Sequence, residues 1–558
     1  MIRRLFIALL MPVLLAAAPA DRSADPQFSV ARFKAHVTFL ADDLLEGRET
    51  GSRGEAIAGA YVAAQFEAMG LTPGGAGGSW YLSVPLRSAK LAARPARLTI
   101  SGAGGTRSWA NGTGVILGPS MYERVQDVAA PAVFVGYGID APDSGLDDYR
   151  GLDVRGKIVV MLAGAPDEIP SEKAAYLTDR KAATAAARGA IAFVTVGTAE
   201  SDKATPWSRR LRAIGSPRMA WIGPDGQPEN DSPGLRASAV LNAAAAERLF
   251  AGAERSYADV RAEAGRKGAR PRGFALATRI RIERRSDWTD SSSRETIGVL
   301  PGSDPTLARQ YVVLTAHIDH LGMRAADPAA PQADLIYNGA IDNAGGIATM
   351  LEAARAFAES PRRPRRSVMF IALTAEEKGL IGSDYFARHP TVPVDSIAAA
   401  VNLDMPMLLY DFTDVIAFGA EHSSIGQAVG KAARSMGVAL SPDPMPEEHV
   451  FVRSDHYSFV KQGVPAVMLA TGYANGGDTS WKDFFATRYH NVGDDMAQPI
   501  HWEAGAKFAR LNYLIARELA DSDARPRWYE GDYFGDLYAP NAPRLPAPPS
   551  LDLKAPRH

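Results

Sequence analysis

The sequence predicts an α/β fold: a mostly parallel mixed sheet flanked by helices, with a smaller β-rich domain inserted into it. From about residue 290, apolar runs of strand length alternate with helical patterns, as in βα units. Between about 90 and 280 the chain consists instead of short β-like runs separated by Gly, Pro and Asp. At 558 residues the chain is long enough for two or more domains.

The first structured region is predicted to be helical over residues 30–70. Gly70 suits a C-terminal cap, and apolar residues recur before it at roughly helical spacing, namely Ile57, Tyr61, Phe66 and Met69. The insert follows over 90–280. Its predicted strands are 131–135, 157–162 and 190–194, with an Ala-rich helix at 182–187.

The second half of the main domain supplies the predicted sheet. Its candidate strands are 297–300, 311–315, 368–373, 397–403 and 466–470, and a helix with one apolar face is predicted at 345–358. The domain limits that follow are 21–89 with 281–522 for the main domain and 90–280 for the insert. Residues 523–558 are rich in Pro and Tyr without periodicity, which predicts a tail that is extended on the surface or disordered.

The N-terminus has the pattern of a secretory signal peptide over residues 1–20. Arg3 and Arg4 precede an apolar run, 5–17, and Ala18-Pro19-Ala20 fits a cleavage site. The run is shorter than the ~20 residues needed to span a membrane. The sequence therefore predicts a periplasmic or secreted protein without a stable membrane anchor.

The composition limits the kinds of partner and the kinds of metal site that the chain can have. A net charge of -2 with no basic stripe gives no reason to expect a nucleic acid partner. With no cysteine, disulfides, thiolate nucleophiles and cysteine-bound zinc are excluded. Any bound metal must therefore be held by His, Asp and Glu.

Residues that can bind metal follow four of the predicted strands. Because open α/β sheets form their sites at the carboxyl ends of strands, these side chains are expected to converge there. The strand ends supply His317, Glu376-Glu377, Asp404 and, after a longer loop, His490, and Asp342 precedes the helix at 345–358.

The number of these residues favours two metal ions. Two histidines and three carboxylates exceed the needs of one four-coordinate zinc with an open position. They suit a pair of ions that share one carboxylate and a water molecule. We predict one ion at His317 and Asp404, another at Glu377 and His490, and Asp342 between them.

Three neighbouring residues receive supporting roles. Asp319, two residues after His317, is placed to bond the other nitrogen of that ring. Glu376 is the natural general base, since it can face the shared water while Glu377 binds metal. His320 is interpreted as a local hydrogen-bonding residue rather than a ligand.

These motifs resemble a known family, the zinc-dependent exopeptidases of the bacterial leucyl aminopeptidase type, over most of the mature chain. The motifs are 39–48, His317-Ile318-Asp319, 339–343, Glu376-Glu377, Asn402-Leu403-Asp404, 453–459 and Tyr489-His490. The resemblance implies two Zn²⁺ ions per chain, bound by the five residues above, with Glu376 as general base. It also implies a cis bond between Asp342 and Asn343, and Tyr489 as a further donor to the substrate oxyanion. Segments 135–138 and 147–158 resemble a protease-associated domain.

Several functions remain open on this metal core. The first is an aminopeptidase acting on peptides with a free N-terminus. A carboxypeptidase or dipeptidase is the alternative, with Arg453 holding the substrate carboxylate, and a non-catalytic binding protein is a third. The contiguous Ser454-Asp455-His456 contains triad residue types, but three neighbours in sequence rarely form a triad. An N/O site would also accept Co or Mn.

Overall fold

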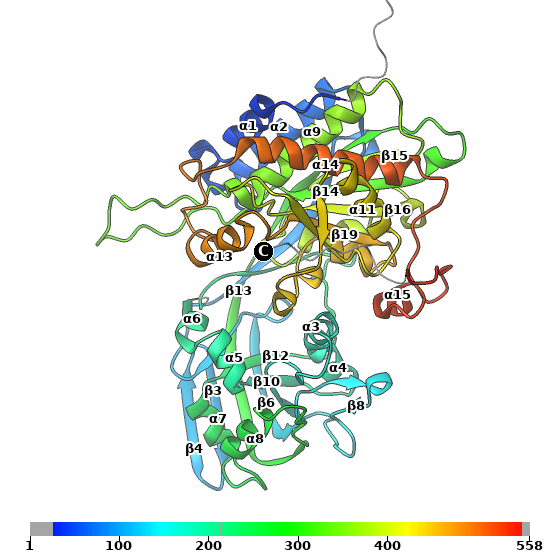
Figure 1. The fold of residues 1–558 in the computed structure, drawn as a ribbon. Coiled ribbons are helices and arrows are strands. Elements are labelled where there is room, and N and C mark those ends of the chain that lie inside the picture. The colour runs from blue at the N-terminus through cyan, green and yellow to red at the C-terminus, as the bar shows by residue number, and fades with distance from the viewer. Residues whose placement is uncertain (1–25, 213, 549–558) are drawn as a thin grey trace, which may run out of the picture.

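The computed structural model describes residues 26–212 and 214–548, and its centre is a mixed sheet flanked by helices (Figure 1). The predicted signal peptide lies outside the described residues. Four parallel strands lie in the order β19, β16, β14, β15. Their bounds are Ala466–Thr471, Ile397–Leu403, Tyr311–His317 and Ser367–Leu373, respectively. The predicted fold class is confirmed.

Antiparallel strands complete the sheet on both sides. β13 pairs with β15, and β17 (Asp414–Phe418) pairs with β19. β18 (Ala439–Ser441) runs parallel to β17 at the far edge. β15 and β16 are buried along their whole length, which explains why both appear in the sequence as continuous apolar runs.

Helices pack around this sheet. α1 (Val30–Leu40), α9 (Gly345–Glu359) and α14 (Trp502–Asp521) contact one another and lie together in Figure 1. α12 (His456–Val460) packs on β16 and β19, and α10 (Ile381–Arg388) packs on α12. The remaining helices of this part are α2 (Arg53–Ala68), α11 (Ile425–Ser435) and α13 (Gly477–Thr487).

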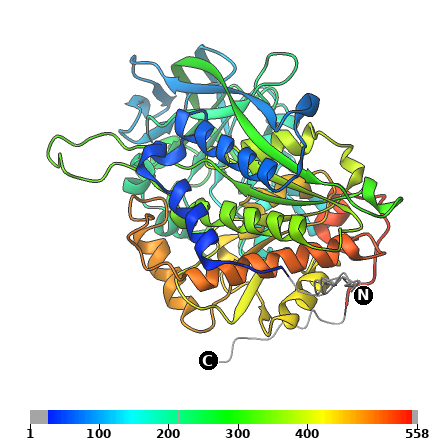
Figure 2. The same cartoon turned by 90° about the horizontal axis from the view of Figure 1, so that it is seen from above.

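One long strand connects the main domain to the insert. β13 (Phe274–Leu300) pairs with β6 (Val125–Phe134) near its start, with β2 (Tyr81–Leu91) in its middle and with β15 at its end. One large core is built from residues between 33 and 82 and between 297 and 534, and a second from residues between 96 and 282. Figure 1 shows the insert as a separate lobe that continues from this strand, and Figure 2 shows α9 and α14 side by side on the main domain.

The insert has its own sheet and helices. β9 (Ile158–Leu162), β10 (Ala192–Val196) and β12 (Ala237–Leu241) are parallel, and β9 also pairs with β6. The predicted strands and the Ala-rich helix of this region are confirmed. The insert also contains β3 (Arg97–Gly102), β4 (Gly105–Ala110), β5 (Val115–Leu117), β7 (Asp140–Ala141), β8 (Leu146–Asp147), β11 (Arg218–Trp221), α3 (Ser171–Asp179), α4 (Lys181–Ala187), α5 (Ala199–Ala204), α6 (Trp207–Arg212), α7 (Ala243–Leu249) and α8 (Tyr257–Ala264).

The segment after residue 523 differs from the predicted surface tail. Trp528 and Phe534 are buried, and α15 (Tyr533–Tyr538) packs its rings against Tyr176 of α3. A few large aromatic side chains can fix a segment that has no hydrophobic periodicity, so the composition of this segment was misleading.

A buried histidine joins three parts of the chain near this segment. His422, in the loop after β17, has Nδ1 2.6 Å from Asp532 and Nε2 3.0 Å from Glu172 of α3. Although burial disfavours the charged ring, the two carboxylates raise the pKa of His422 to about 10. At neutral pH the ring is therefore a cation between two anions.

Within residues 26–212 and 214–548, no helix has both the length and the apolar character needed to cross a membrane.

Candidate metal centre

The predicted ligands converge at the carboxyl ends of the parallel strands. His317 ends β14, and its Nε2 lies 3.2 Å from Asp404 Oδ1 and 3.1 Å from Asp342 Oδ1. Asp404 directly follows β16, and Asp342 precedes α9. All three side chains are buried, and their ligand atoms lie within 4.8 Å of one another. These residues form the first half of the centre.

The second half lies on the other side of Asp342. His490 Nε2 is 3.3 Å from Asp342 Oδ2 and 3.2 Å from Glu377 Oε2. The His490 side chain is 37% exposed, so this half opens toward solvent. The two oxygens of Asp342 thus face different histidines, which is the arrangement a bridging carboxylate requires.

His320 lies closer to the centre than the sequence suggested. Its Nδ1 is 2.6 Å from Glu377 Oε1, so Glu377 has one histidine at each oxygen. Together with Asp342 and Glu377, His320 forms a second group whose ligand atoms lie within 4.8 Å of one another. The prediction of a hydrogen-bonding residue is confirmed, but its partner is a candidate ligand rather than a local group.

Asp319 contacts different groups from those predicted. His317 Nδ1 is 3.1 Å from the backbone oxygen of Asp319 and 3.9 Å from its carboxylate. The carboxylate instead accepts hydrogen bonds from the Thr50 hydroxyl (2.8 Å) and the backbone N–H of Glu376 (3.1 Å). Asp319 therefore orients His317 through its carbonyl and fixes the Glu376 segment through its side chain.

Glu376 and Tyr489 face the same small cavity as His317, Asp342 and His490. Burial raises the pKa of the Glu376 carboxyl, and Asp404 and Glu377 raise it further, against the opposing effect of His317. Burial also raises the pKa of Tyr489, with additional contributions from Asp342 and Glu377. The Tyr489 ring stacks on His490 with centroids 3.9 Å apart. The phenol is thus held beside a candidate ligand in its protonated form.

A chain of hydrogen bonds orients Asp404. The Thr315 hydroxyl donates to Asn402 Oδ1 (2.8 Å), and Asn402 Nδ2 donates to Ser454 Oγ (2.7 Å). Ser454 then donates to Asp404 Oδ2 at 2.5 Å. Ser454 therefore orients a candidate metal ligand, which is a structural role and not that of a triad nucleophile.

Arg48 is a functional residue whose role the sequence did not reveal, although it ends the N-terminal motif. Its buried guanidinium donates to the carbonyls of Ile318 (2.9 Å), Asn338 (2.6 Å) and Gly339 (3.1 Å), and also to that of Leu40. Burial lowers its pKa to about 10, so it stays a cation at neutral pH. One side chain thus joins the two loops that carry His317 and Asp342.

Asp494 supports the same loop from the other side. Its carboxylate accepts the backbone N–H groups of Ile341 and Asp342, both at 2.9 Å. The bond between Asp342 and Asn343 is cis, as the resemblance implied. The one signal of Asp494 in the sequence is its position as an acidic residue shortly after His490.

The start of α9 is packed closely against β16 and its own preceding loop. A Cβ on Gly346 would lie 2.2 Å from the carbonyl of Leu403 and 2.1 Å from Asn343 Oδ1. Only glycine fits this approach. Gly346 therefore allows the helix to pack against the end of β16.

Comparison with known proteins fits this geometry. Residues 295–516, which contain the five candidate ligands and Glu376, match peptidase family M28. The part of the chain that carries the candidate centre is thus similar to peptidase family M28. A structure described as an aminopeptidase from Aneurinibacillus sp. strain AM-1 has the same fold, with a TM-score of 0.50 and 19% identity over 95% of this chain and 98% of that one.

Similar curated proteins match over shorter segments. A "probable zinc metalloprotease" of Pyrenophora tritici-repentis is 36% identical over 110 residues, which are 20% of this chain and 23% of that protein. A "probable leucine aminopeptidase 2" of Aspergillus oryzae is 26% identical over 234 residues, 38% of this chain and 43% of that protein. The chain thus spans less than half the length of either relative.

Proposed function

We propose that this chain belongs to peptidase family M28, and that it is a zinc-dependent aminopeptidase that binds two zinc ions and removes N-terminal residues from peptides. The observation that carries the proposal is Asp342, whose two oxygens face His317 and His490 on opposite sides. One carboxylate shared between two His-containing groups is typical of a dinuclear site.

The donor atoms suit zinc. Each half offers imidazole nitrogen and carboxylate oxygen, which zinc binds in proteins. His317 and Asp404 would hold one ion, Glu377 and His490 the other, and Asp342 would contact both. His320 supports Glu377 from its second oxygen and is a further candidate for the second ion. When bound, zinc supplies an activated water and polarises the scissile carbonyl.

The protein's own groups would handle the protons. Glu376 lies in the cavity with its pKa raised, so it can take a proton from the attacking water and give it to the leaving amine. Tyr489 keeps its phenolic proton and can donate a hydrogen bond to the oxyanion. Asp319 holds the backbone of Glu376 in place during both transfers.

The surroundings favour an aminopeptidase over a carboxypeptidase. The side chain that would hold a substrate carboxylate, Arg453, is already paired with Glu448 at 3.0 Å. One wall of the cavity is apolar, which favours a hydrophobic N-terminal residue. Its apolar lining residues are Met405, Phe418, Val450, Met468, Trp481 and Phe485.

Two parts of the proposal rest on the sequence. The N-terminal pattern over residues 1–20 supports export to the periplasm or secretion. The motifs at 135–138 and 147–158 support a protease-associated domain in the insert.

The decisive experiment compares Leu-p-nitroanilide with N-acetyl-Leu-p-nitroanilide, with and without chelator and added zinc. We expect cleavage of the free amine alone, loss with chelator and recovery with zinc. Cleavage of blocked substrates alone would refute the aminopeptidase assignment.

Glu376→Gln tests the general base. We expect kcat to fall by roughly 10²- to 10⁴-fold while the zinc content stays the same. Wild-type turnover with zinc retained would exclude Glu376 from this role.

A further inference from the structure

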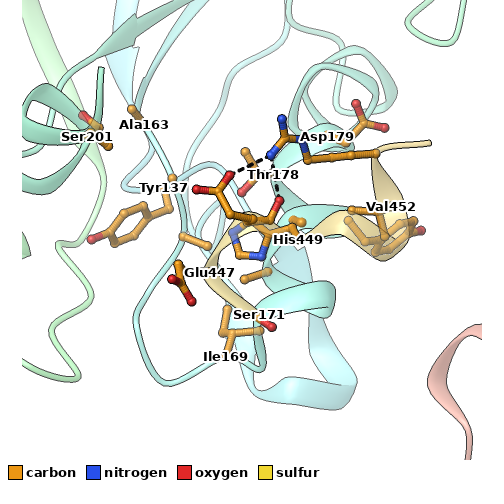
Figure 3. A pocket seen from close by; sticks show the side chains of 18 of the residues that line it. Tyr137, Ala163, Ile169, Ser171, Thr178, Asp179, Ser201, Glu447, His449 and Val452 are labelled. Carbon is orange, nitrogen blue, oxygen red and sulfur yellow. Dashed lines mark hydrogen bonds and ion pairs between the residues drawn. The ribbon is translucent and has the colours of Figure 1, made fainter. Parts of the chain in front are cut away.

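A cavity of about 1450 Å³ lies between the insert and the main domain (Figure 3). Tyr137, Asp179 and Ser201 of the insert lie around it together with Glu447 and His449 of the main domain. Its volume exceeds that of an ordinary small-ligand pocket, which is about 300–1,000 Å³.

This cavity adjoins the metal centre. Glu448 and Arg453 line both the large cavity and the small one that contains His317 and Glu376. Lys378, directly after Glu377, also lines the large cavity. A chain that leaves the metal centre past the 446–453 segment therefore enters the space under the insert.

The lining of the large cavity is strongly acidic. Three cationic side chains, Lys378, Arg453 and Lys461, lie in its wall. The same wall contains eight carboxylates, namely Asp167, Asp179, Glu200, Glu229, Asp231, Asp384, Glu447 and Glu448. A concave surface with charges of one sign concentrates ligands that carry the opposite charge.

Part of this acidity is already neutralised. Arg388 lies within ion-pair distance of Glu229, Asp231 and Asp384, and Lys461 is 2.8 Å from Asp384. Glu200 of α5 and Glu447 of the 446–453 segment are both exposed, and neither has an ion pair within the described chain. These two free carboxylates belong to opposite sides of the cavity.

We propose that this cavity is the chamber that receives the part of a peptide beyond the cleaved bond, and that Glu200 and Glu447 select peptides with basic side chains there. The inference rests on the proposed aminopeptidase function, because the substrate N-terminus then lies at the metal centre and the following residues extend into the chamber. Lysine or arginine at the second and third positions gains attraction from both walls, whereas acidic residues are repelled.

The size of the effect follows from screened electrostatics. A unit charge about 8 Å from another through water gains roughly 0.5 kcal/mol, which is about twofold in affinity. Two such interactions, one for each peptide charge, therefore give about fivefold preference over a peptide with uncharged side chains, and exchanging both lysines for glutamates raises the ratio to about 25-fold. Added salt should reduce this preference for basic peptides, since the Debye length is about 10 Å at 0.1 M.

The test measures binding to the full chain loaded with zinc and carrying Glu376→Gln, so that peptides are retained. The probes are Leu-Lys-Lys-amide and Leu-Glu-Glu-amide, titrated calorimetrically at low and high salt. We expect the lysine peptide to bind at least about tenfold more tightly at low salt. Glu200→Gln with Glu447→Gln should reduce this ratio by fivefold or more.

A matched control replaces two exposed glutamates of the insert that do not line the cavity, Glu247→Gln with Glu254→Gln. The ratio should then stay at its original value. The inference would be overturned if both peptides bound with equal affinity, or if the affinity ratio stayed unchanged in the Glu200/Glu447 variant. It would also be overturned if the control variant reduced the affinity ratio by the same factor.

Turnover of the small neutral substrate Leu-p-nitroanilide separates this inference from the proposed function. If the native protein with zinc cleaves it but binding shows no charge preference, only the chamber assignment fails. If no free-amine substrate is cleaved while the lysine preference persists and depends on Glu200 and Glu447, the chamber stands as a peptide-binding site and the aminopeptidase proposal falls.

Discussion

Replacing Arg48 with methionine should destabilise the protein and loosen the metal centre. The guanidinium bonds four buried carbonyls, those of Leu40, Ile318, Asn338 and Gly339. Each carbonyl left without a donor costs about 1 kcal/mol or more, so we expect a loss of about 4 kcal/mol. That is a large share of the roughly 5–15 kcal/mol by which a domain is stable.

Urea unfolding of the zinc-free protein measures this loss, and competition with a chelator dye measures zinc affinity. Arg48→Lys is the informative control, because it keeps the charge but its single ammonium cannot reach all four carbonyls. We expect it to lie between the native protein and Arg48→Met. Burying the cation also costs free energy, and that cost opposes the stabilisation from its hydrogen bonds. Native-like stability of Arg48→Met would therefore refute our reasoning.

Two further predictions address the centre and the contact between lobes. Asp342→Ala should abolish both zinc sites, whereas His490→Ala should leave one. Metal analysis after gel filtration measures the zinc content of each variant. One retained ion in Asp342→Ala would contradict a bridging role for Asp342. Because contacts with Asp532 and Glu172 raise the pKa of His422 from 6.5 to about 10, its stabilisation should be complete below about pH 6.5 and be lost as the pH rises toward 10. The loss amounts to about 3–5 kcal/mol, and Glu421 and His456 also lie close enough to affect it. Thermal unfolding from pH 6 to 10 should show this dependence in the native protein and not in His422→Gln.

The sheet was predictable because its strands are buried on both faces. β16 was predicted with the bounds that the structure has, since a fully buried parallel strand appears as an uninterrupted apolar run. β13 was predicted only over 297–300, although it begins at Phe274. Its middle contains Asp290, Ser291 and Ser292, which are all exposed, and such polar residues do not resemble a buried strand.

The candidate metal ligands were predictable from the sequence, but the residues that hold the ligand loops in place were not. His317 and Asp404 directly follow apolar strands, so their position in the sequence indicates their place in the fold. Arg48 and Asp494 act on backbone groups that are about 270 and 152 residues away, and no local pattern encodes such contacts. The partner of His320 could not be predicted, because the sequence does not give the position of Glu377 relative to that ring.

The ladder between β2 and β13 suggests where the two lobes can be separated. Tyr81 to Leu91 pairs without a break with Ser286 to Thr296, and Leu91 lies opposite Ser286. A two-residue Asn-Gly turn that joins Leu91 directly to Ser286 would close this ladder as a hairpin. The junction would remove the insert and preserve the register that leads into the metal-bearing sheet. β2 would lose β11 as its neighbour over Leu86 to Ala89 and become an edge strand, although Arg87 already places a charge on that edge.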